Sequence, residues 1–525
     1  MKVDLIVTNA RVYTVNDSFT VTESFAVQDG LFLAVGSNSE INSKYSSEQI
    51  IDARGLSVYP GFNDAHCHFY GYGIDLMQYA DLGGTASQEQ IYKKLQEQYQ
   101  KIGGEWLLGR GWDQNIWPEK EFPDNQRLNE LFPDVAVYLV RIDGHAAWCN
   151  KKALEIAGIT AKTKLEGGEV LLKNGKPTGV LIDNAMELVF KQIPTPGDDL
   201  KTQALVLAQK NCFAVGLTSV TDCGLPKSTI LLIDSLQQDG KLKMRINTMM
   251  DPSAGNLDYF LKKGPYMTDR LQVNSIKLYA DGALGSRGAL LLSDYSDDPG
   301  NRGLLMNPES YFDTICQKAY NAGFQVATHC IGDGANRFIL NVYGKFLKGK
   351  NDRRWRIEHA QVISPEDFKL FGAYSVVPSV QATHATSDMF WAGERLGPER
   401  IKSAYAYQQL LGQNGWLPNG TDFPIEGINP VLTFYASVCR KNADGLPEGA
   451  FQLENALTRE QAIRSITFWA AKAGFQELKK GSIEVGKSAD FVLLNIDLMN
   501  CAEREILMTK VLKTVLGGEL VYSAE

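Results

Sequence analysis

The chain has 525 residues, of which 44% are hydrophobic, 10% aromatic and 22% charged. These are the proportions of ordinary globular proteins, and they exclude disordered, collagen-like and coiled-coil chains. The 53 Lys and Arg residues are outnumbered by 61 Asp and Glu residues, which gives a net charge of -8, and no basic block is present. We therefore expect no nucleic-acid partner.

The first residues, MKVDLIVTNARVYTVND, lack the basic, apolar and small-residue order of a secretory signal. No apolar run approaches the roughly 18 residues that cross a bilayer. The eight cysteines include no Cys-x-x-Cys pair, so neither a zinc ribbon nor a redox motif is indicated. We expect reduced thiols in a cytoplasmic protein without a membrane partner.

Both ends of the chain are rich in short strand patterns. Residues 3–60 alternate β-branched or aromatic runs with Asn, Asp and Gly turns, and residues 481–525 repeat the pattern with Gly517-Gly518 as a hairpin turn. Because chain termini often lie close together, these segments predict one small β domain assembled from residues 1–60 and 481–525.

Residues 61–480 alternate strand-like runs with helical patterns, as βα units do. Eight such runs predict an α/β fold with a closed (β/α)8 TIM barrel: residues 58–62, 217–221, 244–250, 273–280, 324–329, 355–359, 374–381 and 416–421. The gap after the first run predicts an inserted lobe at about 70–211, with a helix at 87–101, a strand at 135–140 and a hairpin turning at Asn174-Gly175. Such insertions help to build active sites at the carboxyl face of a barrel.

Four of the six histidines fall at the carboxyl ends of predicted barrel strands. His66 and His68 follow the first strand, His329 the fifth and His359 the sixth. The two-residue period of a strand places Asp64, His66 and His68 on one face, so both imidazoles can bind one metal. A single His-x-His is often accidental, but four strand-end histidines together predict a metal site inside the barrel.

Two more strand-end residues fit this site. Asp422, after the eighth run, offers a hard oxygen ligand or a general base. Lys277, on the fourth run, stands between apolar neighbours. It either pairs with Asp281, or it reacts with carbon dioxide to give an anionic carbamate whose two oxygens bridge two metals.

The order His-x-His, Lys, His, His, Asp on successive strands, opened by PGFNDAHCH and closed by GKSADFVLLN, resembles the amidohydrolase superfamily of metal-dependent hydrolases. Six further motifs are similar to the branch that contains N-substituted formamide deformylase: GRGWDQNIWP, RIDGHAAWCN, IKLYADGALGSRGA, THCIGDGA, RIEHAQ and NGTDFPIE. The resemblance runs from about residue 3 to 522.

The resemblance implies a barrel with a composite β-sandwich and one or two divalent metals, usually zinc. His66, His68 and Asp422 would hold the first metal, His329 and His359 the second, and a carbamylated Lys277 would bridge them. An unmodified Lys277 would leave a single metal held by a subset of these ligands.

The chemistry implied is hydrolysis of an amide-type C-N bond in a small-molecule substrate, by attack of a metal-bound hydroxide. Asp422 would take the proton from the water and pass it to the leaving nitrogen. Two alternatives remain: hydrolysis of a cyclic amide, ester or heterocycle on the same fold, and a non-catalytic scaffold. The chain is also compatible with a homodimer.

Further candidates surround this centre. His145, in RIDGHAAWCN, either stabilises the tetrahedral oxyanion or is a structural loop residue. His384 and Asp333 lie at the same rim and are candidate substrate contacts. Trp112 either lines an apolar pocket or belongs to a core. Arg287 either meets a substrate anion or pairs with a surface carboxylate.

Overall fold

Seven parallel strands form the centre of the computed structural model, which describes residues 1–524. Their order in the sheet follows their order in the chain: β8 (Phe62–Cys67), β15 (Leu217–Leu225), β16 (Arg245–Met250), β18 (Leu271–Tyr279), β19 (Gln325–Cys330), β20 (Arg356–His359) and β21 (Val377–Ser379). The short β17 (Tyr266–Met267) pairs antiparallel with β18. This sheet confirms the predicted TIM barrel.

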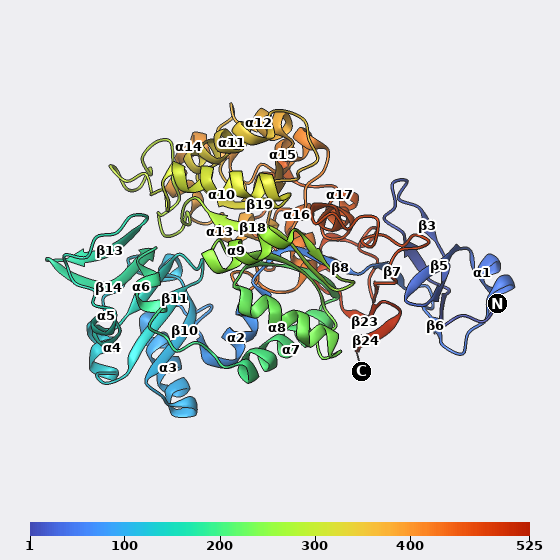
Figure 1. Cartoon of the computed structure of the whole chain (residues 1–525), viewed down its shortest axis with the longest axis horizontal. Helices are drawn as coiled ribbons and strands as arrows, with labels where there is room; N and C mark the ends of the chain where they lie inside the picture. Colours follow the sequence, from blue (N-terminus) through green and yellow to red (C-terminus); the bar gives the residue numbers. More distant parts are fainter. Residues whose placement is uncertain (525) are drawn as a thin grey trace.

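Helices connect consecutive strands and pack around the barrel (Figure 1). They carry their apolar side chains toward the sheet, so that strands and helices share one large hydrophobic core. The helices concerned are α2 (Phe69–Gln78), α7 (Asp198–Ala214), α8 (Lys227–Gln238), α9 (Ala254–Lys263), α10 (Glu309–Ala322), α11 (Asp333–Leu347), α12 (Phe368–Tyr374), α15 (Tyr407–Asn414) and α16 (Pro430–Cys439).

Residues 417–422 close the barrel between β21 and β8. Val380 N donates to Pro418 O (3.1 Å) on one side, and Asp422 N donates to His66 O (2.8 Å) on the other. The segment nevertheless forms no regular strand, with a single parallel bridge between Val380 and Asn419. A proline without an N–H lies within it, which explains why the strand predicted at 416–421 is irregular.

The carboxylate of Asp64 holds this closure together. Its Oδ1 accepts hydrogen bonds from the backbone nitrogens of His66 (3.0 Å) and Thr421 (3.1 Å), and its Oδ2 accepts from Thr421 Oγ1 (2.7 Å). A Cβ at Gly420 would lie 2.5 Å from His66 N and 2.7 Å from Asp64 Oδ1. Only glycine therefore lets the closing segment approach β8 this closely.

The first barrel strand lies later in the chain than predicted. Residues 58–62 fall mostly in β7 (Ser57–Pro60), which belongs to a sheet outside the barrel, and the barrel strand is β8. Both segments are buried along their whole length, so burial does not show which of the two sheets each one joins.

Two sheets built from the chain ends pack into the composite β-sandwich. One contains β1 (Leu5–Thr8), β4 (Ser24–Gln28), β5 (Leu31–Gly36) and β6 (Ile50–Asp52). The other joins both ends of the chain: β2 (Arg11–Tyr13), β3 (Val21–Thr22), β7, β22 (Phe491–Leu494), β23 (Val511–Leu516) and β24 (Glu519–Ser523). Phe25 and Phe491 meet edge to face between the sheets, 5.0 Å apart, and Gly517-Gly518 forms the expected hairpin turn.

The inserted lobe lies at the opposite end of the molecule from the N-terminal sheet (Figure 1). Its sheet contains β9 (Tyr79–Asp81), β10 (Trp106–Trp112), β11 (Ala136–Arg141), β12 (Ala146–Cys149), β13 (Gly168–Lys173) and β14 (Lys176–Asp183). The helices α3 (Gln88–Ile102), α4 (Gln126–Leu131), α5 (Lys151–Ile156) and α6 (Met186–Phe190) complete it. The helix at 87–101, the strand at 135–140 and the hairpin at Asn174-Gly175 are thus confirmed.

Among residues 1–524, no helix combines the length and apolar character of a membrane span. The eight cysteines are unpaired, and all except Cys501 are buried.

We predict that Asp64→Ala lowers the free energy of unfolding by about 3 kcal/mol, because it leaves the buried N–H groups of His66 and Thr421 without an acceptor. Denaturant unfolding measures the change. The matched control is Asp239→Ala, which removes an exposed carboxylate paired only with Lys241. Equal stability of the two variants would contradict a role for Asp64 in closing the barrel.

Candidate functional site

All six histidines of the chain meet at the carboxyl end of the barrel strands. Their rings form one continuous cluster with these centroid separations: His66 to His68 5.8 Å, His66 to His359 4.9 Å, His359 to His329 4.6 Å, His359 to His384 5.7 Å and His329 to His145 4.7 Å. The four strand-end histidines predicted as ligands are therefore brought together. His145 and His384 complete the group from the lobe and from α13 (Ala382–Asp388).

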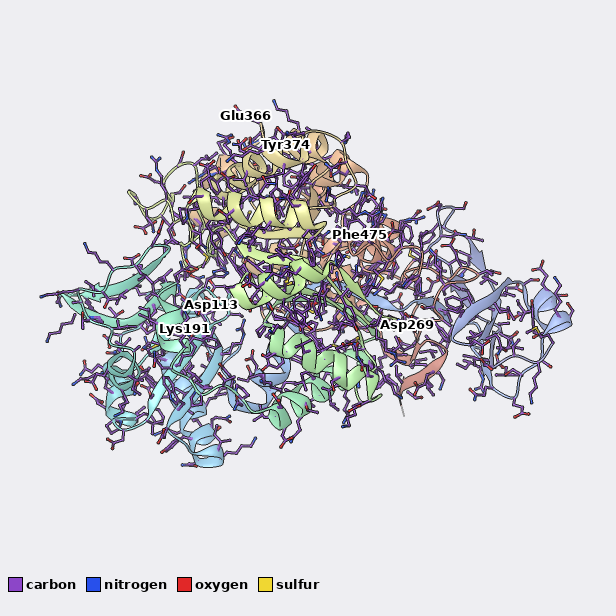
Figure 2. All side chains as sticks on the ribbon, in the orientation of Figure 1. Asp113, Lys191, Asp269, Glu366, Tyr374 and Phe475 are labelled. Atoms are coloured by element: carbon purple, nitrogen blue, oxygen red, sulfur yellow. The ribbon has the colours of Figure 1, made fainter. Side chains whose placement is uncertain are left out.

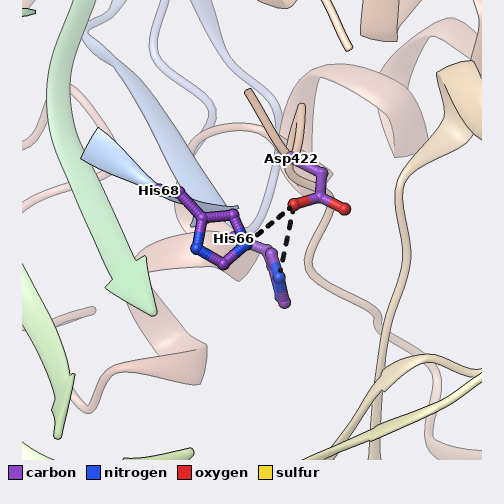
Figure 3. A group of neighbouring side chains, drawn as sticks. All are labelled: His66, His68 and Asp422. Atoms are coloured by element: carbon purple, nitrogen blue, oxygen red, sulfur yellow. Dashed lines mark ion pairs between the residues drawn. The ribbon is translucent and has the colours of Figure 1, made fainter. Parts of the chain in front are cut away.

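The carboxylate of Asp422 lies at the centre of this cluster. Its Oδ1 is 3.5 Å from His66 Nε2 and 3.4 Å from His68 Nε2 (Figure 3). Its Oδ2 is 3.1 Å from His384 Nε2 and 3.9 Å from His359 Nδ1. One carboxylate thus contacts four imidazoles from three segments of the chain.

Two of these residues adopt a backbone conformation that L-amino acids rarely occupy. The φ angle is +73° at His359 and +62° at Asp422. Such conformations strain the backbone, and they concentrate at functional sites, where the direction of the side chain is important. Here they turn the two side chains into the cluster at the point where each segment ends.

Burial sets the charges of the cluster. It lowers the pKa of His66 to about 4, with help from the Lys277 ammonium, and it lowers the pKa of His329 and His359 well below the usual range. Burial alone would raise the pKa of Asp422, but the surrounding imidazoles outweigh it and hold that pKa well below its usual range. At His384 burial would lower the pKa, but hydrogen bonds with Asp422 and Glu426 outweigh it and raise that pKa well above its usual range. Neutral imidazoles, as at His66, His329 and His359, and an ionised carboxylate are the protonation states that metal binding requires.

The donor set fits a divalent metal. Two groups of three side chains have ligand atoms within 4.8 Å of one another: His66, His68 and Asp422, and His359, His384 and Asp422. His359 Nδ1 and Asp422 Oδ1 are buried and have no hydrogen-bond partner within the described residues, so their lone pairs are available. Imidazole nitrogens with a carboxylate oxygen are the ligands of catalytic zinc sites.

Lys277 and His329 lie beside these two groups. Lys277 is buried, with its Nζ 3.2 Å from His66 Nε2. The alternative that Lys277 pairs with Asp281 is wrong, because the Asp281 carboxylate accepts hydrogen bonds from the backbone nitrogens of residues 290, 331 and 332. His329 packs its ring against His359, and its Nε2 lies 3.3 Å from Gly282 O.

A buried ion pair between Arg356 and Glu358, which was not predicted from the sequence, contacts the Nδ1 side of His66. Glu358 Oε2 is 2.5 Å from His66 Nδ1 and accepts a hydrogen bond from Arg356 Nη2 (2.9 Å). Burial would raise the pKa of Glu358, but Arg356 and His66 outweigh it and lower that pKa to about 2. The sequence does contain a pattern that indicates this ion pair: the buried strand has two charged residues on one face, in Arg356-Ile-Glu358. A carboxylate in this place fixes the ring orientation of a ligand histidine.

His145 reaches the site from the inserted lobe. Its Nδ1 is 2.7 Å from Asp183 Oδ1, and Asp183 is itself buried. A Cβ at Gly282 or Gly288 would lie 2.3 or 2.5 Å from Asp183 Oδ2, so these glycines let the lobe approach the barrel. Burial lowers the pKa of His145, but Asp183 and Asp143 outweigh it and raise the pKa overall.

The cluster opens into a cavity of about 150 Å³ between the barrel and the lobe. Asp113 marks the lobe side of this cavity, and Figure 2 shows it where the lobe faces the barrel. Several lining residues were not predicted from the sequence, because they come from segments far apart in the chain: Arg141, Asp143, Tyr279, Gln361, Asp388, Trp391 and Glu426. Asp183 could have been predicted as a site residue, because it is a carboxylate at the end of a buried strand, β14, in the same way as Asp422 ends a buried run.

Three predicted substrate contacts do not line this cavity in the described structure, and those predictions are corrected. Trp112 is fully buried in the core of the lobe, where its Nε1 donates to Leu139 O (2.8 Å). Asp333 accepts a hydrogen bond from Leu292 N (2.9 Å) at the start of α11. Arg287 pairs with Asp297 (2.9 Å). In each case a local partner inside the protein already satisfies the polar group.

The sequence matches the amidohydrolase family over residues 49–522. It is 34% identical to the protein LONG AFTER FAR-RED 3 of Arabidopsis thaliana, with 99% of this chain and 91% of that protein covered. An N-substituted formamide deformylase of Arthrobacter pascens is 24% identical, with 99% of this chain and 98% of that protein covered. The crystal structure of an uncharacterized metal-dependent hydrolase from Pyrococcus horikoshii has a TM-score of 0.77 and 27% identity, covering 95% of this chain and 99% of that one.

These similarities extend over both the barrel and the β-sandwich, and they confirm the resemblance that the histidine motifs indicated. The chain belongs to the amidohydrolase family of metal-dependent hydrolases.

Proposed function

We propose that this protein hydrolyses an amide-type C-N bond in a small molecule. The observation that carries the proposal is the ionised Asp422 carboxylate within a cluster of buried imidazoles, which is a donor set for a divalent metal beside a proton acceptor. A relative at 24% identity is named for deformylating N-substituted formamides, which supports this bond type. The cavity of about 150 Å³ favours a small substrate, and the unpaired cysteines favour a cytoplasmic location.

His66, His68 and Asp422 would hold the metal, with His359 and either His329 or His384 holding a second. We propose zinc, because imidazole and carboxylate ligands suit it. A bound metal polarises the substrate carbonyl and lowers the pKa of water. Lys277 stands next to His66, where a carbamate formed on its Nζ would add two anionic oxygens to the ligand set.

Asp422 would act as the general base and then as the general acid. Its Oδ1 has no hydrogen-bond partner among the described residues, so this oxygen is free to accept the proton of the attacking water. The same carboxyl group would then deliver the proton to the leaving nitrogen. A carboxylate ionised at neutral pH is required for the first step, and the imidazoles around Asp422 supply that condition.

His145 would stabilise the oxyanion that develops on the carbonyl oxygen. Its Nδ1 is held by Asp183, which leaves the other ring nitrogen on the cavity side. Asp183 and Asp143 raise the pKa of His145, which favours the protonated ring. A protonated ring donates a charge-assisted hydrogen bond. The lobe would thus supply the donor and the barrel the base.

Removal of metal should abolish amide hydrolysis, and zinc should restore it. Protein purified without chelator is analysed for elements, dialysed against a strong chelator and then reloaded, while amine release from an amide library is measured. Two zinc ions per chain would support a bridging carbamate on Lys277, and one would support an unmodified lysine. Full activity of the metal-free protein would contradict the proposal.

Asp422→Asn should reduce kcat by roughly 10²- to 10⁴-fold, because the amide cannot take up the proton. Part of the metal content should remain, since the amide oxygen still ligates. Steady-state kinetics and elemental analysis on the same sample separate these two effects. Asp313→Asn, which alters an exposed carboxylate on α10, serves as the control. Near-normal kcat in the Asp422 variant would remove this residue from the proton-transfer role.

Asp183→Asn should lower kcat/KM by roughly 10-fold or more, because His145 loses the anion that orients it. Neither residue is among the candidate ligands, so metal content should not change. In a double-mutant cycle, the Asp183 substitution should have little further effect once His145 is replaced by Gln. Additive losses would show that Asp183 does not act through His145.

A further inference from the structure

The cavity lining contains more carboxylates than cations. Five acidic side chains face two permanently charged basic ones among the described residues: Asp113, Asp143, Asp388, Asp422 and Glu426 against Arg141 and Lys277. Since an unpaired charge in a partly desolvated cavity is costly, each carboxylate is expected to have a partner. The contacts of each one show which of them lacks it.

Arg141 compensates two of the five carboxylates. The guanidinium is 2% exposed and bonds to Asp143 through Nη1 (2.5 Å), to Asp113 through Nη2 and to Gln114 Oε1 through Nε (2.7 Å). All three of its nitrogens are therefore engaged within the protein. This arginine is not available to bind an anionic group of a substrate.

Two further carboxylates are partners of His384. Asp422 and Glu426 each lie 3.1 Å from a ring nitrogen of His384. Lys277, the other cation of the lining, lies next to His66 on the same side. These charges are accounted for by contacts at the candidate metal site.

Asp388 is the remaining carboxylate, and its hydrogen bonds come from neutral groups. Tyr405 Oη donates to Asp388 Oδ2 (2.7 Å), and Gln361 Nε2 donates to the same oxygen (3.2 Å). Both donors converge on one oxygen, which fixes the carboxylate and leaves Oδ1 without a hydrogen bond from residues 1–524. Burial raises the pKa of Asp388 to about 7, and nearby His384 only partly offsets this effect.

Trp391 contributes an aromatic ring to the same cavity lining as Asp388. Trp391 lies three residues after Asp388, in the turn between α13 and α14 (Ala392–Arg400), and its backbone nitrogen is 3.0 Å from Asp388 O. Its ring already accommodates a cation, because the Arg395 guanidinium lies 5.6 Å from the ring centroid. A carboxylate and an indole that line one cavity form a combination that binds cationic nitrogen groups.

We propose that Asp388 and Trp391 form a subsite for a cationic nitrogen group on the substrate, separate from the bond that is cleaved. The proposal rests on the function proposed above and narrows its substrate class to small amides that carry an ammonium or amidinium group. Such a cation completes the pairing of Asp388. An anionic substituent would instead meet a lining rich in carboxylates, with its arginine already bound.

Binding to the zinc-loaded protein tests the subsite with three amides of equal length. The probes are N-acetyl-1,4-diaminobutane, which is cationic, N-pentylacetamide, which is neutral, and 5-acetamidopentanoate, which is anionic. Calorimetry should show the cationic amide binding about tenfold more tightly than the neutral one, with the anionic amide weakest. Equal binding of the cationic and neutral amides, or a preference for the anionic one, would overturn the proposal.

Variants assign the preference to the two residues. Asp388→Asn should weaken the cationic amide about tenfold and leave the neutral amide unchanged, and Trp391→Leu should reduce the same preference severalfold. Glu394→Gln, which removes an exposed charge on α14, should leave the preference intact. A preference for the cation that survives Asp388→Asn would overturn the assignment. If a variant does not fold, the affinities of the three amides for the unmodified protein still test the proposal.

The two proposals fail in different ways. The binding series needs no turnover, so the ranking of the probes tests the subsite even if none of the amides is hydrolysed. Absence of hydrolysis together with tight binding of the cationic amide would contradict the amidase proposal alone. Hydrolysis that is equally efficient for the cationic and neutral amides, with equal affinities, would contradict the subsite alone.

Discussion

The carboxylate of Asp64 is the interaction on which the site depends most. It ties the backbone of His66, in the first barrel strand, to the backbone and hydroxyl of Thr421, in the segment that closes the barrel. The candidate ligands His66, His68 and Asp422 lie directly beside these two attachment points. Because the closing segment forms no regular strand, a side-chain contact replaces part of the missing ladder of backbone hydrogen bonds. Barrel closure and ligand placement are therefore consequences of one buried group.

Burial then determines the chemistry of the cluster. Low solvent access keeps His66, His329 and His359 neutral, and the surrounding imidazoles keep Asp422 ionised, so the centre is ready to bind a cation. The inserted lobe adds a different environment on the opposite side, where carboxylates predominate and Arg141 is already paired. The barrel thus contributes the ligands and the base, while the lobe contributes His145 and much of the cavity wall. This division follows from the insertion of the lobe directly after the first barrel strand.

Much of this arrangement was predictable from local patterns. The alternation of strands and helices indicated the barrel, the strand-like ends indicated the composite sheet, and the His-x-His pattern placed two imidazoles on one face. The positions of His329 and His359 followed from the same rule. The limits of individual strands were harder to predict, because β7 and β8 are consecutive buried strands that join different sheets. The side chains Trp112, Asp333 and Arg287 were assigned to the cavity wrongly, since each has a partner nearby that only the folded chain brings close.

Sequence patterns were enough to predict the barrel, the family and the ligand residues, because strand period and motif order depend on neighbours within a few residues. The tertiary structure alone decided which charges are paired. Three contacts show this: Glu358 with His66, Asp183 with His145, and Tyr405 with Asp388. In each of them the two residues are separated in the chain and meet only in the folded protein. Electrostatic compensation in a cavity depends on distances and desolvation, and these quantities exist only once the segments have packed together.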